Sequence, residues 1–197
     1  WREETFHNQE IVAKAGFEAN IIENHDQPRG ASLFIPEEDY GFYSLSALAT
    51  IIFCERGLPF LYQGQEIGMS NRQWKYDEFN DLETINQYQI ALKAGMSKEQ
   101  ALEIARHHSR DNARTPMQWS SEENAGFSKG QPWMPVNENY KVVNVAEEEK
   151  EYGSILNFYK RLIAFYKSEE YNEILTYGDF GPMYEKEDHI FAYSRSY

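Results

Sequence analysis

Asn24, His25 and Asp26 follow one another in the chain and bring three kinds of polar group to one short segment. An amide, an imidazole and a carboxylate can together hydrogen-bond neighbouring hydroxyl groups of a sugar. The carboxylate of Asp26 can also balance positive charge that develops on a ring carbon. A structural interpretation competes with this one, in which Asp26 forms a turn or caps a helix and His25 is a hydrogen-bonded loop residue. The three residues alone leave both interpretations open.

A second polar cluster lies at residues 110–119, with the sequence RDNARTPMQW. Arg110 and Arg114 are four positions apart, and Asp111 lies between them. Guanidinium groups can hold a carboxylate through paired hydrogen bonds, so this spacing is typical of a fork that orients an acid. An ion pair that braces a long loop is the alternative, and the motif taken by itself favours that alternative.

We expect neither a metal site nor a cofactor. Cys54 is the single cysteine, which excludes a disulfide framework and a cysteine-based zinc site. It lies in the apolar run 45–54, and we expect it to be a buried core thiol. His107 and His108 are adjacent rather than four positions apart, so they do not share one face of a helix.

The elements around the first cluster must hold it at one edge of a sheet. Residues 17–23 are short and apolar, as in a buried strand, and residues 24–30 form a loop because Pro28 disfavours helix at the residue before it. Residues 43–56 are predicted to be a buried helix, and residues 58–63 a second strand. Two strands separated by a helix form a βαβ unit with a parallel sheet, and ligands bind beyond the carboxyl ends of such strands.

The remaining segments contain more helix than strand. Apolar spacing predicts helices at 3–15, 82–94, 97–109 and 153–166. Residues 111–145 carry three prolines and are expected to be irregular. Antiparallel strands are predicted at 174–177 and 183–197, with a turn near Asp188.

Composition excludes several partners. The 197 residues include 19 basic and 32 acidic side chains, a net charge of −13. Tight binding to a phosphate backbone or an anionic membrane needs a basic face, so we expect neither partner. The apolar run 45–54 is too short to span a bilayer. The acidic charge, the free cysteine and the lack of a visible leader favour the cytoplasm.

Residues 24–29 and 110–119, taken together, resemble the α-amylase clan of glycoside hydrolases (family 13), and within it the oligo-1,6-glucosidase and α-glucosidase subgroup. Three further stretches share this resemblance: GLPFLYQGQEIGM at 57–69, NAGF at 124–127, and PW at 132–133 with Val136-Asn137 after it. These motifs are long, occur in the family order and cover nearly the whole chain. The resemblance is therefore much more specific than a match to one short pattern.

The resemblance implies an α/β fold, namely the C-terminal part of a (β/α)8 barrel followed by the start of an antiparallel β domain. Barrel strands seven and eight would be 17–23 and 58–63. Helices six, seven and eight would be 1–16, 43–56 and 153–166, with a long insertion before the last of them. The catalytic barrel would end at residue 168, so that the two domains are 1–168 and 169–197.

The resemblance also implies roles for single residues. Family enzymes cleave α-glucosidic bonds with retention, using a nucleophile and an acid/base that follow strands four and five. Neither strand lies in this sequence, and neither does the family's calcium loop. Asp26 matches the third family carboxylate, which stabilises the transition state, and His25 and Arg110 match residues that bind the terminal glucose. Glu83 matches an acid near the leaving-group sugar. The supporting residues are Arg114 and Asn24.

The resemblance thus predicts a fragment of a retaining, exo-acting α-glucosidase that acts on α-1,4 or α-1,6 bonds of starch-, isomaltose- or dextran-type oligosaccharides. Trehalose-6-phosphate hydrolase and a non-catalytic barrel relative are the alternatives, and the joint presence of His25, Asp26 and Arg110 favours an enzyme. A free-standing sugar-binding module is disfavoured because two parallel strands would leave unpaired edges. We expect the isolated chain to be inactive and to self-associate.

Overall fold

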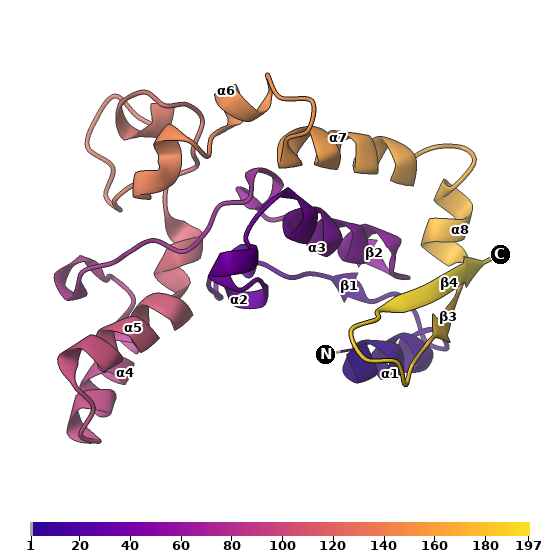
Figure 1. Cartoon of the computed structure of the whole chain (residues 1–197), viewed down its shortest axis with the longest axis horizontal. Coiled ribbons are helices and arrows are strands. Elements are labelled where there is room, and N and C mark those ends of the chain that lie inside the picture. The colour runs from indigo at the N-terminus through magenta and orange to yellow at the C-terminus, as the bar shows by residue number, and fades with distance from the viewer. Residues whose placement is uncertain (1) are drawn as a thin grey trace. The chain divides into compact units, whose positions relative to one another are not determined.

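The computed structural model describes residues 2–197 (Figure 1). In chain order, its helices and strands are α1 (Arg2–Val12), β1 (Ala19–Asn20), α2 (Gly30–Phe34), α3 (Phe42–Cys54), β2 (Leu58–Pro59), α4 (Leu82–Lys93), α5 (Lys98–His108), α6 (Val145–Glu148), α7 (Ile155–Tyr166), α8 (Asn172–Tyr177), β3 (Asp179–Met183) and β4 (Ala192–Ser196). The chain forms two compact units. The first contains the residues up to Ile21, Ala47–Phe60 and Tyr159–Tyr197, and the second contains Ile22–Ser46 and Leu61–Phe158.

In the first unit, strands β1 and β2 pair in parallel, with Ala19 opposite Leu58. This pairing confirms the predicted βαβ unit. Each strand has two residues and is much shorter than the expected ranges 17–23 and 58–63. Hydrogen bonds from Leu58 N to Glu18 O (2.8 Å) and from Phe60 N to Asn20 O (3.0 Å) join the two segments. The Asn20 side chain donates to the carbonyls of Ile52 and Glu55, which ties the strand to the end of α3.

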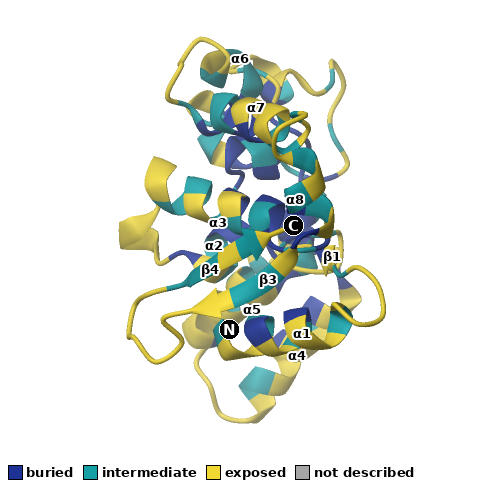
Figure 2. Ribbon diagram, turned by 90° about the vertical axis from the view of Figure 1, so that its right-hand side faces the viewer, coloured by how far each residue is buried: buried dark blue, intermediate teal, exposed yellow. Residues whose placement is uncertain are grey.

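The C-terminal segment of the first unit forms an antiparallel hairpin. Strand β3 pairs with β4 from Asp179 opposite Ser196 to Met183 opposite Ala192. Both strands mix half-buried residues, such as Phe180 and Tyr193, with exposed ones (Figure 2). An antiparallel hairpin with a connection that contains Asp188 is confirmed, but β3 lies between the predicted strands 174–177 and 183–197 and shares only Met183 with them.

The predicted strand at 174–177 is wrong, because these residues belong to helix α8. Their β-branched and aromatic side chains favour a strand, but an isolated strand leaves its backbone groups unpaired. The helix pairs these groups internally, as the bond from Gly178 N to Ile174 O shows, and it buries Leu175. Tertiary packing therefore overrides local propensity here.

The expectation that Cys54 is a buried core thiol is also wrong, because Cys54 is only half-buried. It lies at the last position of α3. The nearby core residues of the first unit are instead Ala49, Ile52 and Phe53, which occupy earlier positions on the same helix. Burial still raises the pKa of the Cys54 thiol.

The second unit contains a helical hairpin, in which α4 and α5 pack side by side (Figure 1). Asp81 caps the start of α4, and Ser97 with Gln100 forms a capping box at the start of α5. A buried cluster beside this hairpin comprises Trp74, Phe79, Ala105 and Met134. The region 111–145 contains no helix or strand longer than short 3-10 turns, as predicted.

No helix within residues 2–197 combines the length and the apolar character that crossing a membrane requires.

Candidate functional site

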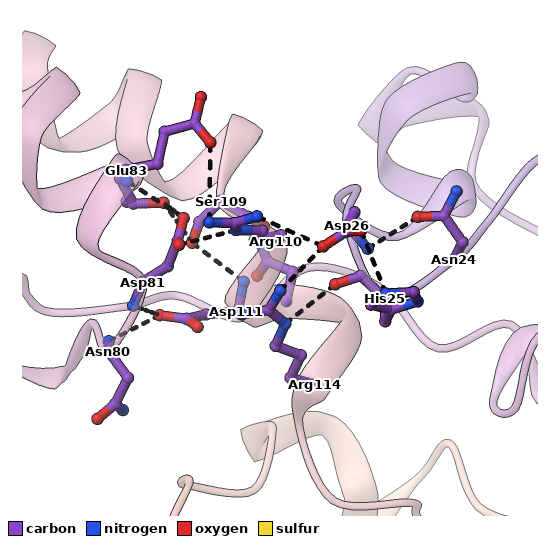
Figure 3. Close-up of polar contacts among 12 residues, drawn as sticks. Asn24, His25, Asp26, Asn80, Asp81, Glu83, Ser109, Arg110, Asp111 and Arg114 are labelled. Carbon is purple, nitrogen blue, oxygen red and sulfur yellow. Dashed lines mark hydrogen bonds and ion pairs between the residues drawn. The ribbon is translucent and has the colours of Figure 1, made fainter.

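The predicted polar triplet forms a turn that exposes its side chains (Figure 3). The Asn24 Oδ1 atom accepts a hydrogen bond from Asp26 N at 2.8 Å, which fixes the backbone of the turn. His25 Nε2 lies 3.1 Å from Asp26 Oδ2. The side chains of His25 and Asp26 are 70% and 54% exposed, so both can reach a ligand from solution.

Both arginines of the second motif point toward the same carboxylate (Figure 3). Arg114 Nη2 lies 3.1 Å from Asp26 Oδ1, and Arg114 Nε donates to His25 O at 3.0 Å. Arg110 Nη1 lies 3.4 Å from the same Oδ1 atom. The two arginines lie on one 3-10 turn, Arg110–Arg114, whose first residues are held by Ser109 Oγ. The turn thus places two positive charges beside one oxygen of Asp26 and leaves Oδ2 to His25.

Asp81 holds Arg110 from the side away from Asp26. Arg110 Nε lies 2.7 Å from Asp81 Oδ1, which is the shortest ion pair that the structure gives for this arginine. Burial disfavours the charge on Asp81, but hydrogen bonds from Thr84 and Arg110 outweigh this cost and lower the pKa of its carboxyl group. The same hydrogen bond and the Asp81 charge raise the pKa of Arg110. Both groups are therefore charged at neutral pH.

Glu83, the remaining predicted residue, lies at the edge of this cluster. Its Oε2 atom is 3.8 Å from Arg110 Nη2, and its side chain is 69% exposed. It belongs to the first turn of α4, directly after the capping residue Asp81. The structure therefore brings all six predicted residues together: Asn24, His25, Asp26, Glu83, Arg110 and Arg114.

Sequence reasoning assigned no role of their own to two acidic residues of the cluster, Asp81 and Asp111. Asp111 is buried, and its Oδ2 atom accepts hydrogen bonds from Asn80 N (2.7 Å) and Asp81 N (2.9 Å). The signal for Asp81 was present, because an aspartate directly before a helical pattern, with Thr84 three positions on, is typical of a helix cap. The role of Asp111 as an acceptor for a remote backbone segment has no such local signal.

A buried ion pair connects the Asp26 turn to the arginine turn. Arg29 donates from Nε to Asn112 O at 3.2 Å and from Nη1 to Gln63 O at 2.7 Å. Its Nη1 atom also lies 3.5 Å from Glu23 Oε2, and Glu23 Oε1 accepts from Gly30 N at 2.7 Å. Burial raises the pKa of Glu23 to about 7, although Arg29 opposes this shift. Because Arg29 bonds to both neighbouring segments, the Asp26 turn is held rigidly against the turn that carries Arg110 and Arg114.

This arrangement suits a neutral polar ligand with several hydroxyl groups. It offers carboxylate acceptors, guanidinium donors and an imidazole within a few ångströms of one another. Among residues 2–197 there is no group of three or more histidine, cysteine, aspartate or glutamate side chains that could hold a metal ion. His107 and His108 contact each other edge to face, with ring centroids 4.7 Å apart.

Comparison with known proteins places the chain in one protein family. Residues 1–178 match the family model described as "Alpha amylase, catalytic domain". An oligo-1,6-glucosidase from Bacillus cereus is 40% identical over 191 residues, which cover 96% of this chain and 34% of that protein. An α-glucosidase from Candida albicans is 41% identical over 170 residues, which cover 81% of this chain and 29% of that protein. The chain thus spans about a third of the length of the curated relatives it matches.

Solved structures agree with this match. The crystal structure of trehalose-6-phosphate hydrolase from Bacillus licheniformis has a TM-score of 0.92 and 38% identity, covering 100% of this chain and 35% of that one. An isomaltulose synthase from Klebsiella sp. LX3 has a TM-score of 0.90 and 34% identity, with the same shares covered.

Proposed function

Because the chain belongs to the α-amylase catalytic-domain family, we propose that it is the C-terminal part of a retaining, exo-acting α-glucosidase. The observation that carries this proposal is the setting of Asp26, whose Oδ1 atom lies within 3.4 Å of two guanidinium groups while its side chain stays 54% exposed. An exposed carboxylate held by two cations is oriented toward a ligand rather than buried for stability. The sequence identity of about 40% to oligo-1,6-glucosidases also supports an α-glucosidase.

In this proposal Asp26 stabilises the transition state. Cleavage of a glycosidic bond places positive charge on the sugar ring, and a fixed carboxylate next to that ring lowers the energy of the charged state. The arginines keep the carboxylate oriented, so that little reorganisation is needed during the reaction. His25 and Arg110 donate hydrogen bonds to hydroxyl groups of the terminal glucose, while Asn24 and Arg114 support the turn.

Glu83 contacts the sugar on the leaving-group side in this proposal. The nucleophile and the acid/base, about 5–5.5 Å apart in a retaining enzyme, belong to a part of the polypeptide outside this chain. The isolated chain therefore binds a glucose unit at most and does not hydrolyse it.

The substrate we propose is an oligosaccharide with α-1,6 or α-1,4 glucosidic bonds. Oligo-1,6-glucosidases and a glucan 1,6-α-glucosidase from Streptococcus pneumoniae among the relatives favour the α-1,6 linkage. Trehalose-6-phosphate is the second candidate, because a hydrolase of that name has a TM-score of 0.92 against this chain. A non-catalytic relative is disfavoured, because such a protein has no need to keep His25, Asp26 and Arg110 in contact.

The fold assignment that accompanies this function is also a proposal. Strands β1 and β2 would be barrel strands seven and eight, and α1, α3 and α7 would be barrel helices six to eight. Residues 65–150 would form the long insertion between strand eight and helix eight. The catalytic barrel would occupy residues 1–168 and the start of the antiparallel β domain residues 169–197. We place the enzyme in the cytoplasm, with no metal or cofactor bound by these residues and no nucleic-acid or membrane partner.

The test uses the full-length enzyme that contains this chain. Wild type and Asp26→Asn are assayed with isomaltose, maltose, trehalose-6-phosphate and p-nitrophenyl α-glucoside, and Asp77→Asn is the matched control on an exposed acid. Asp26→Asn should lower kcat about 10²- to 10³-fold, as does the loss of one transition-state contact in other enzymes. A wild-type enzyme without activity on any of these substrates, or an Asp26→Asn variant with wild-type kcat, would refute the proposal.

A further inference from the structure

Both carboxylate oxygens of Asp81 accept hydrogen bonds from residues of the candidate site or next to it. Its Oδ1 atom accepts from Arg110 Nε at 2.7 Å. Its Oδ2 atom accepts from Thr84 Oγ1 at 2.8 Å and from Thr84 N at 3.2 Å. The backbone N–H of Asp81 donates to Asp111 Oδ2 at 2.9 Å, and the residue is only 6% exposed. Asp81 is therefore fixed from several sides and has little freedom to move when a ligand binds.

The contact with Asp81 decides how Arg110 faces the site. It occupies the Nε edge of the guanidinium group and leaves Nη1 and Nη2 on the side of Asp26 and Glu83. The distances to these two acids, 3.4 Å and 3.8 Å, are long for charge-assisted hydrogen bonds. The Nη1 and Nη2 donors are therefore available to sugar hydroxyl groups without breaking a strong bond.

Asp81 also determines where Glu83 lies. As the cap of α4, it sets the first turn of the helix on which Glu83 is the second residue. The carboxylate of Asp81 thus holds Arg110, which we assign to the terminal glucose. It also caps the start of α4, the helix that carries Glu83, which we assign to the leaving-group side. Figure 3 shows Asp81 beside the Arg110 guanidinium group, with Glu83 above both.

We propose that Asp81 is a positioning residue that fixes the spacing of Arg110 and Glu83, and with it the spacing of the two sugar subsites. This inference rests on the function proposed above. Asp81 has no direct contact with substrate in this proposal and acts through Arg110 and α4. If Asp81 served only to cap α4, replacing it with another good capping residue would leave KM unchanged.

The deciding variant is Asp81→Ser in the full-length enzyme. Serine caps a helix as well as aspartate does, but it is too short to reach Arg110. If Asp81 positions Arg110, Asp81→Ser should raise KM for isomaltose about 10-fold, since charge-assisted hydrogen bonds of this kind change affinities by that order. Thr84→Val removes the hydroxyl that bonds to Asp81 Oδ2 and Ser109 Oγ, but it keeps the backbone cap and the arginine contact. This variant should lower the melting temperature and change KM less than twofold.

A double-mutant cycle with Arg110→Lys separates the two roles. Lysine lacks the Nε edge that Asp81 holds, so Asp81→Ser should change KM less than twofold in the Arg110→Lys background. Asp81→Asn, a second variant of nearly the same size, is measured in both backgrounds as well, and Asp77→Asn is the control for the lost charge. Equal changes of KM in both backgrounds, or a wild-type KM in Asp81→Ser, would overturn the positioning role. An inactive wild-type enzyme would instead overturn the proposed function.

Discussion

Arg114 and Asp26 are 88 residues apart in the sequence, and yet Arg114 Nη2 lies 3.1 Å from Asp26 Oδ1. The same guanidinium group donates from Nε to the carbonyl of His25 at 3.0 Å. Arg114 therefore holds both the backbone and the carboxylate of the turn. It is closer to Asp26 than Arg110 is, which makes it the main orienting contact of that carboxylate.

The first prediction concerns this orienting contact. Arg114→Lys keeps the positive charge but cannot make both hydrogen bonds from one rigid group. In the full-length enzyme we expect kcat/KM for an α-glucoside to fall about 10- to 100-fold, the range for loss of a charge-assisted hydrogen bond. Steady-state kinetics measure this change, with Arg56→Lys outside the site as the control. An equal effect of the two substitutions would show that Arg114 does not orient Asp26.

The second prediction concerns the chain by itself. The purified 197-residue chain should not release p-nitrophenol from p-nitrophenyl α-glucoside, because the proposed nucleophile and acid/base are absent from it. Measurable turnover by the pure chain would contradict this assignment.

The third prediction is that the isolated chain associates with itself. The apolar side chains of Ile21, Leu58 and Phe60, at or beside the strands, are each about half exposed. In the described part of the chain, β1 and β2 pair only with each other, so each has a free edge. Light scattering at increasing concentration should show particles larger than a monomer, and a monodisperse monomer would refute this prediction.

The fourth prediction concerns Gly64, which lies next to the buried Arg29. Its φ of +91° is in the left-handed region, and a Cβ there would lie 2.5 Å from Met69 Sδ and 2.9 Å from Arg29 Nη1. Gly64→Ala should therefore destabilise the protein by about 1–3 kcal/mol. Thermal unfolding measures the effect, and Gly16→Ala is the control because its added Cβ would meet nothing within 4 Å.

The fifth prediction concerns pH. Burial, and to a lesser extent the charge of Glu18, raise the pKa of Glu55 to about 7. Its Oε1 atom has no hydrogen-bond partner among residues 2–197. The unfolded value is about 4.3, so the folded chain binds this proton more tightly. The resulting stabilisation is fully present below about pH 4 and is lost as the pH rises to about 7.

Glu55→Gln removes this titration. We expect the variant to be more stable than wild type at pH 8, on the order of 1–3 kcal/mol, and the difference to disappear near pH 4. Melting temperatures across this pH range test the expectation, with the exposed Glu151→Gln as control. A difference that does not vary with pH would show that the Glu55 carboxyl group is not responsible.

Local patterns predicted the helices well. The four helices expected from apolar spacing appear as α1, α4, α5 and α7, with ends shifted by at most three residues. Their periodicity spans several turns, so errors at single positions matter little. The segment 174–177 has no such length, and its strand-like composition was overridden by the helix that buries Leu175.

By itself, the sequence determined which polar residues form the candidate site, because their types and motif order are local information. It could not show that Arg114 is nearer to Asp26 than Arg110, or that Asp81 and Asp111 belong to the same network. Those relationships depend on contacts across 29 to 88 positions of the chain. Only the tertiary structure brings these segments together, because a hydrogen bond depends on distance and direction in space rather than on separation along the chain.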